Sequence, residues 1–396
     1  MAGSAMTNGQ AASPRVFFYV QHLLGIGHLA RASRIAGALA KDGFDVTVVT
    51  GGTPVAGFPG PHVRHIALPT ITAGDAGFSG LADIDGKPVD DAFKDSRRDL
   101  LLAAFRENQP DVVIIEAFPF GRRQVRFELL PLLDEIAAMD NRPMVMTSLR
   151  DILQERSKPG RDEETVAVLK QYFDRVLVHG DPAFARLEDT FPPAAEIADK
   201  VIYTGLVAAP PPAEPAELFD IIVSAGGGAV GNALIRAALE AAKSIDRRLS
   251  WALITGPNLP QSDFDAISSA APAHVSVYRF RPDFASLLKG ARLSVSQAGY
   301  NTVCDILRAG CHPLLIPFTA GGETEQTVRA ERLERLGLAH VLPEETLSPQ
   351  TMMQGIKAAL AVSGRPPHRL DLDGAQRTAE ILRGLLRPAI RRCQSP

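Results

Sequence analysis

A histidine behind a short glycine loop stands where it could take a proton from a hydroxyl group. His28 follows Gly25-Ile-Gly27 and precedes the apolar spacing of a helix in Leu29–Lys41. Imidazole has a pKa near neutrality, and a helix N-terminus lowers that pKa, so a neutral ring at this position suits general-base catalysis. The same pattern fits a histidine that only packs at a turn. His22, at the end of the preceding strand, competes for the role.

Charged side chains follow other apolar segments of the first half. Glu116 ends one such segment, and we expect it to act as a second acid or base or to orient His28. The loop after it carries three arginines, and Arg150-Asp151 follows another segment. Guanidinium groups hold phosphate or carboxylate well, which indicates an anionic acceptor, although each residue alone fits a solvated surface with salt bridges. The predicted acceptor site consists of Gly25, Gly27, Arg122, Arg150 and Asp151.

A triple glycine in the second half suits the binding of a diphosphate. Ala225-Gly-Gly-Gly-Ala229 lies between an apolar segment and a helical pattern. Backbone N–H groups of such a loop can surround phosphate oxygens. Ser224, just before the loop, could add a hydroxyl group. A flexible turn between a strand and a helix would have the same composition.

A second turn of this kind lies in Gln297-Ala-Gly-Tyr-Asn-Thr302. Gly299 permits a sharp turn, and we expect Asn301 or Thr302 to cap the helix that follows. The N-terminus of that helix favours an anion, because its N–H groups are free and its dipole is positive there. Asp305, one turn further on, is placed to accept hydrogen bonds from ribose hydroxyls.

Alternating apolar strands and amphipathic helices have to position these residues. One β/α series runs through residues 15–207 and a second through residues 217–373, which predicts an α/β protein with two doubly wound sheets. Open sheets of this kind bind ligands at the carboxyl ends of their strands, where the residues above lie. The proline-rich residues 208–216 are the predicted linker, because such segments are semi-rigid and mark domain boundaries.

The ends of the chain and two stretches of the first half carry further expectations. Residues 1–14 are small and polar and are expected to be a disordered leader, and residues 374–396 to form a C-terminal helix. In the first half, residues 69–96 read as a long loop, and Pro182–Thr190 as a short helix. Loops of that length are uncommon and are often functional.

Composition excludes several classes of protein. The chain has 396 residues, enough for two domains, and a formal net charge of −3, which gives no electrostatic case for nucleic-acid binding. Its three cysteines are too few for a disulfide framework and lack zinc-site spacing. No apolar run reaches the roughly 20 residues that span a bilayer, and no G-x-G-x-x-G loop indicates a dinucleotide cofactor. We therefore expect a cytoplasmic protein.

The second half resembles the donor-binding half of GT-B glycosyltransferases. The likeness is greatest to the peptidoglycan-type UDP-N-acetylglucosamine transferases and to a related group of predicted bacterial glycosyltransferases. It rests on Gln297–Thr302, Asp305, the apolar strand ending at Pro317 and the pair Glu325-Gln326. Many relatives carry His or Arg in place of Gln297, and Glu in place of Asp305. The resemblance implies two Rossmann-like domains that face each other across a cleft, with the last helix crossing back onto the first domain.

This resemblance also implies a reaction and the roles of further residues. We expect an inverting, metal-independent hexosyltransferase that uses a UDP-sugar or a related nucleotide sugar, with His28 as the general base. Relatives hold uracil near a phenylalanine that Phe280 matches, and sugar hydroxyls with a pair that Glu325-Gln326 matches. Phe280 in the core and Arg281 on the surface remain equal alternatives. The predicted donor site consists of Ser224, Gly226, Gly227, Gly228, Phe280, Arg281, Gln297, Gly299, Asn301, Thr302, Asp305, Glu325 and Gln326.

Two D-x-D pairs have the spacing with which the other glycosyltransferase class, GT-A, holds a metal. Asp83-Ile-Asp85 and Asp371-Leu-Asp373 both lie in expected loops and do not follow a buried strand. We interpret both as surface acids. We expect no cofactor apart from the nucleotide-sugar substrate, because GT-B enzymes need no bound metal for catalysis.

Two other functions fit the same fold. A nucleotide-sugar hydrolase or epimerase would use water or no external acceptor, and the arginine-rich acceptor side argues against it. A non-catalytic sugar-binding subunit would not need candidate chemical groups on both halves. The acceptor itself, whether a sugar, a lipid or a small metabolite, is not identified by the sequence, and a lipid would bring peripheral membrane contact.

Overall fold

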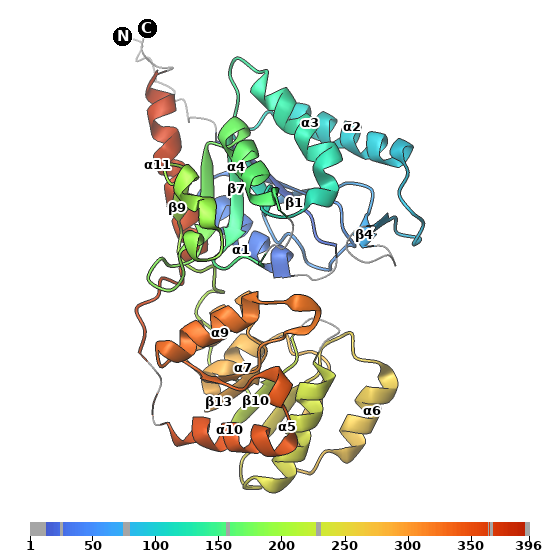
Figure 1. Ribbon diagram of the computed structural model, residues 1–396, viewed down its shortest axis with the longest axis vertical. Coiled ribbons are helices and arrows are strands. Elements are labelled where there is room, and N and C mark those ends of the chain that lie inside the picture. Colours follow the sequence, from blue (N-terminus) through green and yellow to red (C-terminus); the bar gives the residue numbers. More distant parts are fainter. Residues whose placement is uncertain are drawn as a thin grey trace, which may run out of the picture.

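The computed structural model describes residues 13–23, 27–73, 80–155, 159–226, 231–362, 364 and 367–392. Most of the expected leader, residues 1–14, therefore lies outside the described residues. Within them the chain forms two parallel sheets, each in its own half and each covered by helices (Figure 1). The α/β class and the two doubly wound halves are as the alternating pattern predicts.

The first sheet has the strand order β3-β2-β1-β6-β7-β8-β9, and all of its pairs are parallel. Its central strands read as continuous apolar runs because helices bury both faces. In β1, RVFFYV, five of the six residues are buried. The strands are β1 (Arg15–Val20), β2 (Asp45–Thr50), β3 (Arg64–Ala67), β6 (Val112–Glu116), β7 (Met144–Arg150), β8 (Arg175–His179) and β9 (Val201–Tyr203).

Alternate residues of β1 face two separate cores. Val16 and Phe18 pack with α1 (Gly27–Lys41) on one side. Phe17 and Tyr19 pack on the other side with α2 (Asp91–Asn108), α3 (Arg126–Ala137) and α4 (Arg161–Tyr172). This alternation follows from the two-residue period of a strand. It leaves α1 on the face that lies towards the second half, as Figure 1 shows.

The second sheet has the order β12-β11-β10-β13-β14-β15, again parallel. Its strands are β10 (Ile221–Ser224), β11 (Trp251–Ile254), β12 (Val275–Tyr278), β13 (Leu293–Ser296), β14 (His312–Leu315) and β15 (His340–Val341). One face packs against α5 (Asn232–Ser244), α6 (Gln261–Ala270) and α10 (Pro349–Ala361). The other face packs against α7 (Phe284–Gly290), α8 (Tyr300–Ala309) and α9 (Glu325–Arg335). The core on this second face is continuous with the core beneath α1.

The last helix, α11 (Gly374–Arg392), returns to the first half and lies against α1 (Figure 1). The returning chain pairs with the segment before the linker, where the Leu206 N–H donates to the Asp371 carbonyl at 2.7 Å. Gly374 is required at this crossing, because a Cβ atom there would stand 2.3 Å from the Gly205 carbonyl oxygen. The halves are thus joined twice, by the linker and by this return.

The structure corrects three local expectations. The stretch 69–96 is not one loop: it holds a hairpin of β4 (Thr72–Ala73) and β5 (Leu81–Ala82), and α2 already begins at Asp91 because Asp90 caps it. Between Pro182 and Thr190 only the 3-10 turn Leu187–Asp189 forms. Helix α8 begins at Tyr300 with Gly299 as its N-cap. Asn301 and Thr302 therefore lie inside its first turn and do not cap it.

The D-x-D aspartates serve the fold. Asp83 Oδ1 accepts hydrogen bonds from the backbone N–H groups of Asp85 and Lys87, which closes the hairpin turn. Asp373 forms an ion pair with Arg308 of α8. Among the described residues no cluster of three potential metal ligands occurs. In the same residues no helix is long and apolar enough to cross a membrane.

Candidate active site

His28 and Glu116 meet at the carboxyl edge of the first sheet. His28 is the second residue of α1, and Glu116 ends β6, the strand that lies beside β1. Nδ1 of His28 lies 2.9 Å from Oε1 of Glu116. The Glu116 carboxylate is fully buried, whereas the His28 side chain keeps 23% of its surface exposed. Glu116 is therefore held inside the protein, whereas part of the His28 ring remains accessible.

Electrostatics decide which nitrogen of His28 carries the proton. Burial alone would raise the pKa of Glu116, but the Arg31 guanidinium and the hydrogen bonds from His28 and Ser148 hold it well below its ordinary value. An ionised carboxylate only accepts hydrogen bonds, so Nδ1 must be the donor and Nε2 keeps its lone pair. Burial and the nearby Arg122 charge lower the pKa of His28 to about 3. The ring is thus neutral and ready to accept a proton at Nε2.

A chain of buried hydroxyl and imidazole groups holds the other oxygen of Glu116. Ser148 Oγ donates to Glu116 Oε2 at 2.7 Å. His179 Nε2 lies 2.9 Å from the same Ser148 oxygen and must donate to it, because the serine proton is already committed. His179 Nδ1 then accepts from Thr204 Oγ1, 2.8 Å away. Sequence reasoning missed these residues; the available signal was that Ser148 and His179 are polar residues within or ending apolar strands.

Arg31 and Tyr300 connect this series of hydrogen bonds to the second half of the protein. The Arg31 guanidinium forms an ion pair with Glu116 and lies 5.3 Å from the centre of the Tyr300 ring. The Tyr300 hydroxyl donates to the His179 carbonyl at 2.8 Å and accepts from the Val207 N–H at 2.8 Å. The first residue of α8 is therefore bound to the backbone of His179, whose ring belongs to the hydrogen-bonded chain that holds Glu116. Both residues were outside the predicted site.

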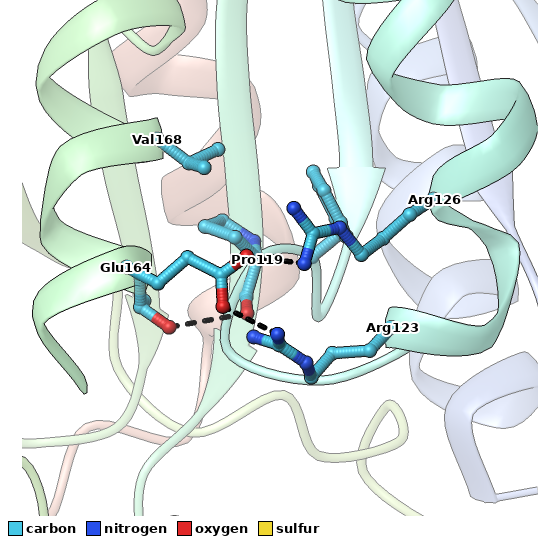
Figure 2. Close-up of a pocket in the computed structure, with 7 residues that line it drawn as sticks. Pro119, Arg123, Arg126, Glu164 and Val168 are labelled. Atoms are coloured by element: carbon cyan, nitrogen blue, oxygen red, sulfur yellow. Dashed lines mark hydrogen bonds and ion pairs between the residues drawn. The ribbon is translucent and has the colours of Figure 1, made fainter. Parts of the chain in front are cut away.

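The three arginines after Glu116 do not act together. Arg123 and Arg126 turn towards Glu164 of α4 and form ion pairs with it, as Figure 2 shows. They line a small pocket with Pro119 and Val168 (Figure 2). Arg122 does not line that pocket, and its charge lowers the pKa of His28. Only Arg122 of the three is placed near the candidate base.

The other two charged residues of the predicted acceptor site, Arg150 and Asp151, form ion pairs within a cluster that includes Glu325 of the predicted donor site. Arg150 forms an ion pair with Glu325. Asp151 Oδ1 accepts from Arg329 at 2.7 Å, and Arg329 also lies 2.6 Å from Glu325. Asp151, Glu325 and Arg329 are almost entirely buried, so this cluster is an ionic connection between the two halves. Arg329, which completes it, was not predicted.

Three further donor candidates are bound to protein atoms. Asn301 Nδ2 donates to the Gly27 carbonyl at 3.0 Å, next to His28. Asp305 accepts two hydrogen bonds from Arg34 of α1, at 2.9 and 3.2 Å. Gln326 accepts from the N–H groups of Ala298 and Phe318. Asn301 and Asp305 thus contact the first half in this arrangement of the domains, and Gln326 holds the turn before α8.

Similarity to a known family covers most of the second half. Residues 221–369 match the model of the glycosyltransferase family 28 C-terminal domain. This stretch is therefore similar to the C-terminal domain of that family. A UDP-N-acetylglucosamine–N-acetylmuramyl-(pentapeptide) pyrophosphoryl-undecaprenol N-acetylglucosamine transferase of Gloeobacter violaceus is 30% identical over 177 residues, 42% of this chain and 48% of the relative. The enzyme of that name from Thermotoga neapolitana is 29% identical over 200 residues, 50% and 53% of the two chains. The chain matches about half the length of these relatives.

Solved structures agree over nearly the whole chain. MurG of Acinetobacter baumannii superposes with a TM-score of 0.57 at 16% identity and covers 95% of this chain and 99% of its own. CalG4, the calicheamicin glycosyltransferase, superposes with a TM-score of 0.59 at 18% identity and covers 94% of each chain. These likenesses show the fold, which is that of GT-B glycosyltransferases. The resemblance expected from the sequence is confirmed.

All the predicted donor residues fall within residues 221–369, the stretch that matches the family 28 model. Gly226 has a φ of 74°, and its N–H donates to Ser224 Oγ at 3.3 Å, so the turn after β10 forms as a glycine turn. Phe280 is 68% exposed, which places it outside the core. Arg281 is held by Glu217 and Asp283. Gly25, Gly227 and Gly228 lie outside the described residues.

The remaining donor candidates surround the start of α8. Gln297 lies beside the glycine turn, since a Cβ atom on Gly226 would stand 3.6 Å from its Oε1. Gly299 has extended backbone dihedrals, and Thr302 is partly buried in the first turn of the helix. The structure thus brings the ends of β10 and β13 together. Contacts of these residues with a nucleotide stay a prediction.

Proposed function

We propose that this chain is a glycosyltransferase that moves a sugar from a UDP-linked donor to a hydroxyl group of a sugar or lipid-linked acceptor. The family 28 domain supports the donor side. The observation that carries the chemistry is the His28–Glu116 pair, with Nδ1 fixed at 2.9 Å and Nε2 left to accept a proton. The acceptor binds to the first half, and the donor binds to the second.

The reaction is a direct displacement with inversion. The acceptor oxygen attacks the anomeric carbon, and the bond from that carbon to the donor phosphate oxygen breaks, so that UDP leaves with the bonding electrons. The acceptor proton passes to Nε2 of His28. Glu116 stabilises the imidazolium that forms, which compensates for the low pKa of the resting ring.

The departing diphosphate needs positive potential but no metal. The glycine turn after β10 and the N-terminus of α8 meet at the same sheet edge, because β10 and β13 are neighbours. Backbone N–H groups and helix dipoles at such an edge stabilise negative charge without having to reorganise. We therefore propose a metal-independent reaction, in which chelators leave the rate unchanged.

A nucleotide titration and a turnover assay test this function. UDP should bind to the full chain in isothermal calorimetry, and a UDP-sugar should be consumed only when an acceptor from a panel of sugars and polyprenyl phosphosugars is added. His28→Ala should keep UDP binding and lose at least 10²-fold in kcat. NMR of the product should show an inverted anomeric centre. Undiminished turnover of the variant would refute the role of His28, and rapid release of free sugar without acceptor would identify a hydrolase.

A further inference from the structure

Helix α1 of the first half lies against helix α8 of the second half. Each helix begins at one of the two candidate sites. His28 is the second residue of α1, and α8 starts at the sheet edge where the departing diphosphate is proposed to bind. A contact between these two helices therefore joins the candidate base to the donor side. Two side chains make hydrogen bonds across this interface.

Asn301 of α8 makes the contact next to the base. Its Nδ2 donates to the Gly27 carbonyl at 3.0 Å, and Gly27 immediately precedes His28. A carbonyl oxygen only accepts hydrogen bonds, so the amide nitrogen must face it. A side chain at position 27 would crowd this contact, because its Cβ atom would stand 3.3 Å from that nitrogen. The donor-side helix is thus bonded to the backbone directly before the candidate base.

Arg34 makes the second contact, further along α1. Its Nη2 donates to both oxygens of Asp305 on α8, at 2.9 and 3.2 Å, and its Nη1 donates to the Val207 carbonyl at 3.1 Å. The Arg34 and Asp305 side chains keep only 20% and 15% of their surface exposed. Salt screens partly buried pairs of this kind less than exposed ones. Helix α1 is thus tied both to α8 and to the segment just before the linker.

The residues of α1 that contact α8 lie on one face of the helix. Gly27, Arg31 and Arg34 follow one another at intervals of four and three residues, the spacing that places residues on the same side of a helix. Between the two hydrogen-bonded contacts, the Arg31 guanidinium lies over the Tyr300 ring, 5.3 Å from its centre. Contacts along the whole of this face fix the position and the rotation of α1 against α8.

We infer that Asn301 and Arg34 are positioning residues for His28, because they dock α1 onto α8 and so place the base against the donor. This inference rests on the proposed function, in which His28 takes the acceptor proton. It gives Asp305 a different role from the ribose contact expected from the sequence, since both of its oxygens hold Arg34. A catalytic group that is misplaced by about 1 Å can cost about 10²-fold in rate, so a docking contact of this kind acts on kcat.

Calorimetry with UDP and turnover of the donor–acceptor pair that the assay above selects test this inference on the full chain. Asn301→Ala and Arg34→Gln should each lower kcat by at least about tenfold and leave the donor KM and the affinity for UDP within about twofold. Arg332→Gln is the matched control and should keep kcat within about twofold. Arg332 also joins the halves, through Asp189 at 2.9 Å and the Phe184 carbonyl at 3.0 Å, and its side chain is 18% exposed, but it belongs to α9.

The His28→Ala background separates positioning from a general effect on the site. No base remains to be positioned there, so adding Asn301→Ala or Arg34→Gln should lower the residual kcat by less than about twofold. A further loss of about tenfold in that background would overturn the inference, because the two residues would then act on the donor or on the fold. Arg34→Lys keeps the charge and should recover part of the activity that Arg34→Gln loses.

Other outcomes of the turnover and binding measurements also decide the matter. An unchanged kcat in Asn301→Ala or in Arg34→Gln overturns the inference, and so does an equal loss in Arg332→Gln. Tighter binding of UDP by Arg34→Gln overturns it as well, because Arg34 would then only occupy a carboxylate that the nucleotide needs. Thermal unfolding checks that each variant is folded.

Amide hydrogen exchange tests the docking without any turnover. If the wild type turns over no donor, the proposed function fails, and exchange in residues 27–41 still reports whether α1 is held by α8. Exchange there should be faster in Arg34→Gln than in the wild type and unchanged in Arg332→Gln. Equal exchange in all three proteins would overturn the docking itself.

Discussion

Glu116 accepts a hydrogen bond from Nδ1 of His28 at 2.9 Å, and this contact determines the tautomer of the candidate base. Glu116→Gln keeps the shape of the side chain but can place an amide N–H against Nδ1, which would move the ring proton to Nε2. We expect kcat to fall by about 10²- to 10⁴-fold while UDP still binds. Nitrogen NMR of labelled histidine would report the tautomer directly. A variant with the Nδ1–H form and normal kcat would contradict this account.

Ser148 is expected to act through Glu116, because it occupies the other carboxylate oxygen at 2.7 Å. Ser148→Ala removes that hydrogen bond and leaves Glu116 free to turn. A hydrogen bond to a charged group is worth about 1.5–3 kcal/mol, so kcat should fall roughly tenfold to a hundredfold with KM little changed. Thr147→Val is the control. Thr147 is the preceding residue, and its buried hydroxyl has no partner among the described residues. Equal losses in both variants would indicate a general packing effect.

The elements of the fold were predictable because apolar residues recur in the sequence with the spacing of buried strands and helices. Strands such as β1 and β6 read as apolar runs, and helix α10 begins directly after Ser348, a residue type that commonly caps helices. Helix starts were less clear: the polar residues Asn301 and Thr302 suggested a cap, but Gly299 already provides it.

The supporting residues of the site could not be predicted in the same way. Ser148 and His179 are 31 residues apart in the chain and meet only because β7 and β8 are neighbours. Strand order belongs to the tertiary structure, and the pattern of apolar residues within a strand does not determine which strands become its neighbours. Likewise, Glu325 and Asp151 were assigned to different ligands, whereas Arg329 binds both. The residue types at the strand ends indicated where a site could lie, but the sequence did not show which residues would contact one another there.

The rate should depend little on pH over the range in which an ordinary histidine titrates. The pKa of His28 is lowered to about 3 by burial and by Arg122, so the ring stays in its base form as the pH falls from 8 to about 5. Arg122→Gln removes the repelling charge, so the pKa should rise and the acid limb of the kcat profile should move to higher pH. Glu116→Gln should do the opposite, since the carboxylate raises this pKa. A wild-type profile that halves near pH 6.5 would be evidence against this arrangement.

The ion pairs of Arg329 should contribute to stability as a unit. Breaking a buried ion pair by removing one partner typically costs about 3–5 kcal/mol, because the other charge stays buried. Asp151→Asn should therefore lower the free energy of unfolding by several kcal/mol in a urea titration. Glu135→Gln is the control, because its pair with Arg106 is exposed and such pairs contribute less than about 1 kcal/mol. Similar small effects in both variants would show that the halves do not depend on this cluster.

His179 should make the folded state sensitive to acid. Burial lowers the pKa of its ring from 6.5 to about 3, so the unfolded chain takes up a proton over this interval and the folded protein does not. Stability is therefore fully present above pH 6.5 and falls with decreasing pH by up to about 1.4 kcal/mol per pH unit. Between pH 6.5 and about pH 4.5, His179→Gln should lose about 2 kcal/mol less than the wild type in urea titrations. The difference between the two curves isolates this ring from the other groups that titrate. Parallel curves would mean that His179 is protonated in the folded protein, and its Nδ1 could not then accept the hydrogen bond from Thr204 Oγ1.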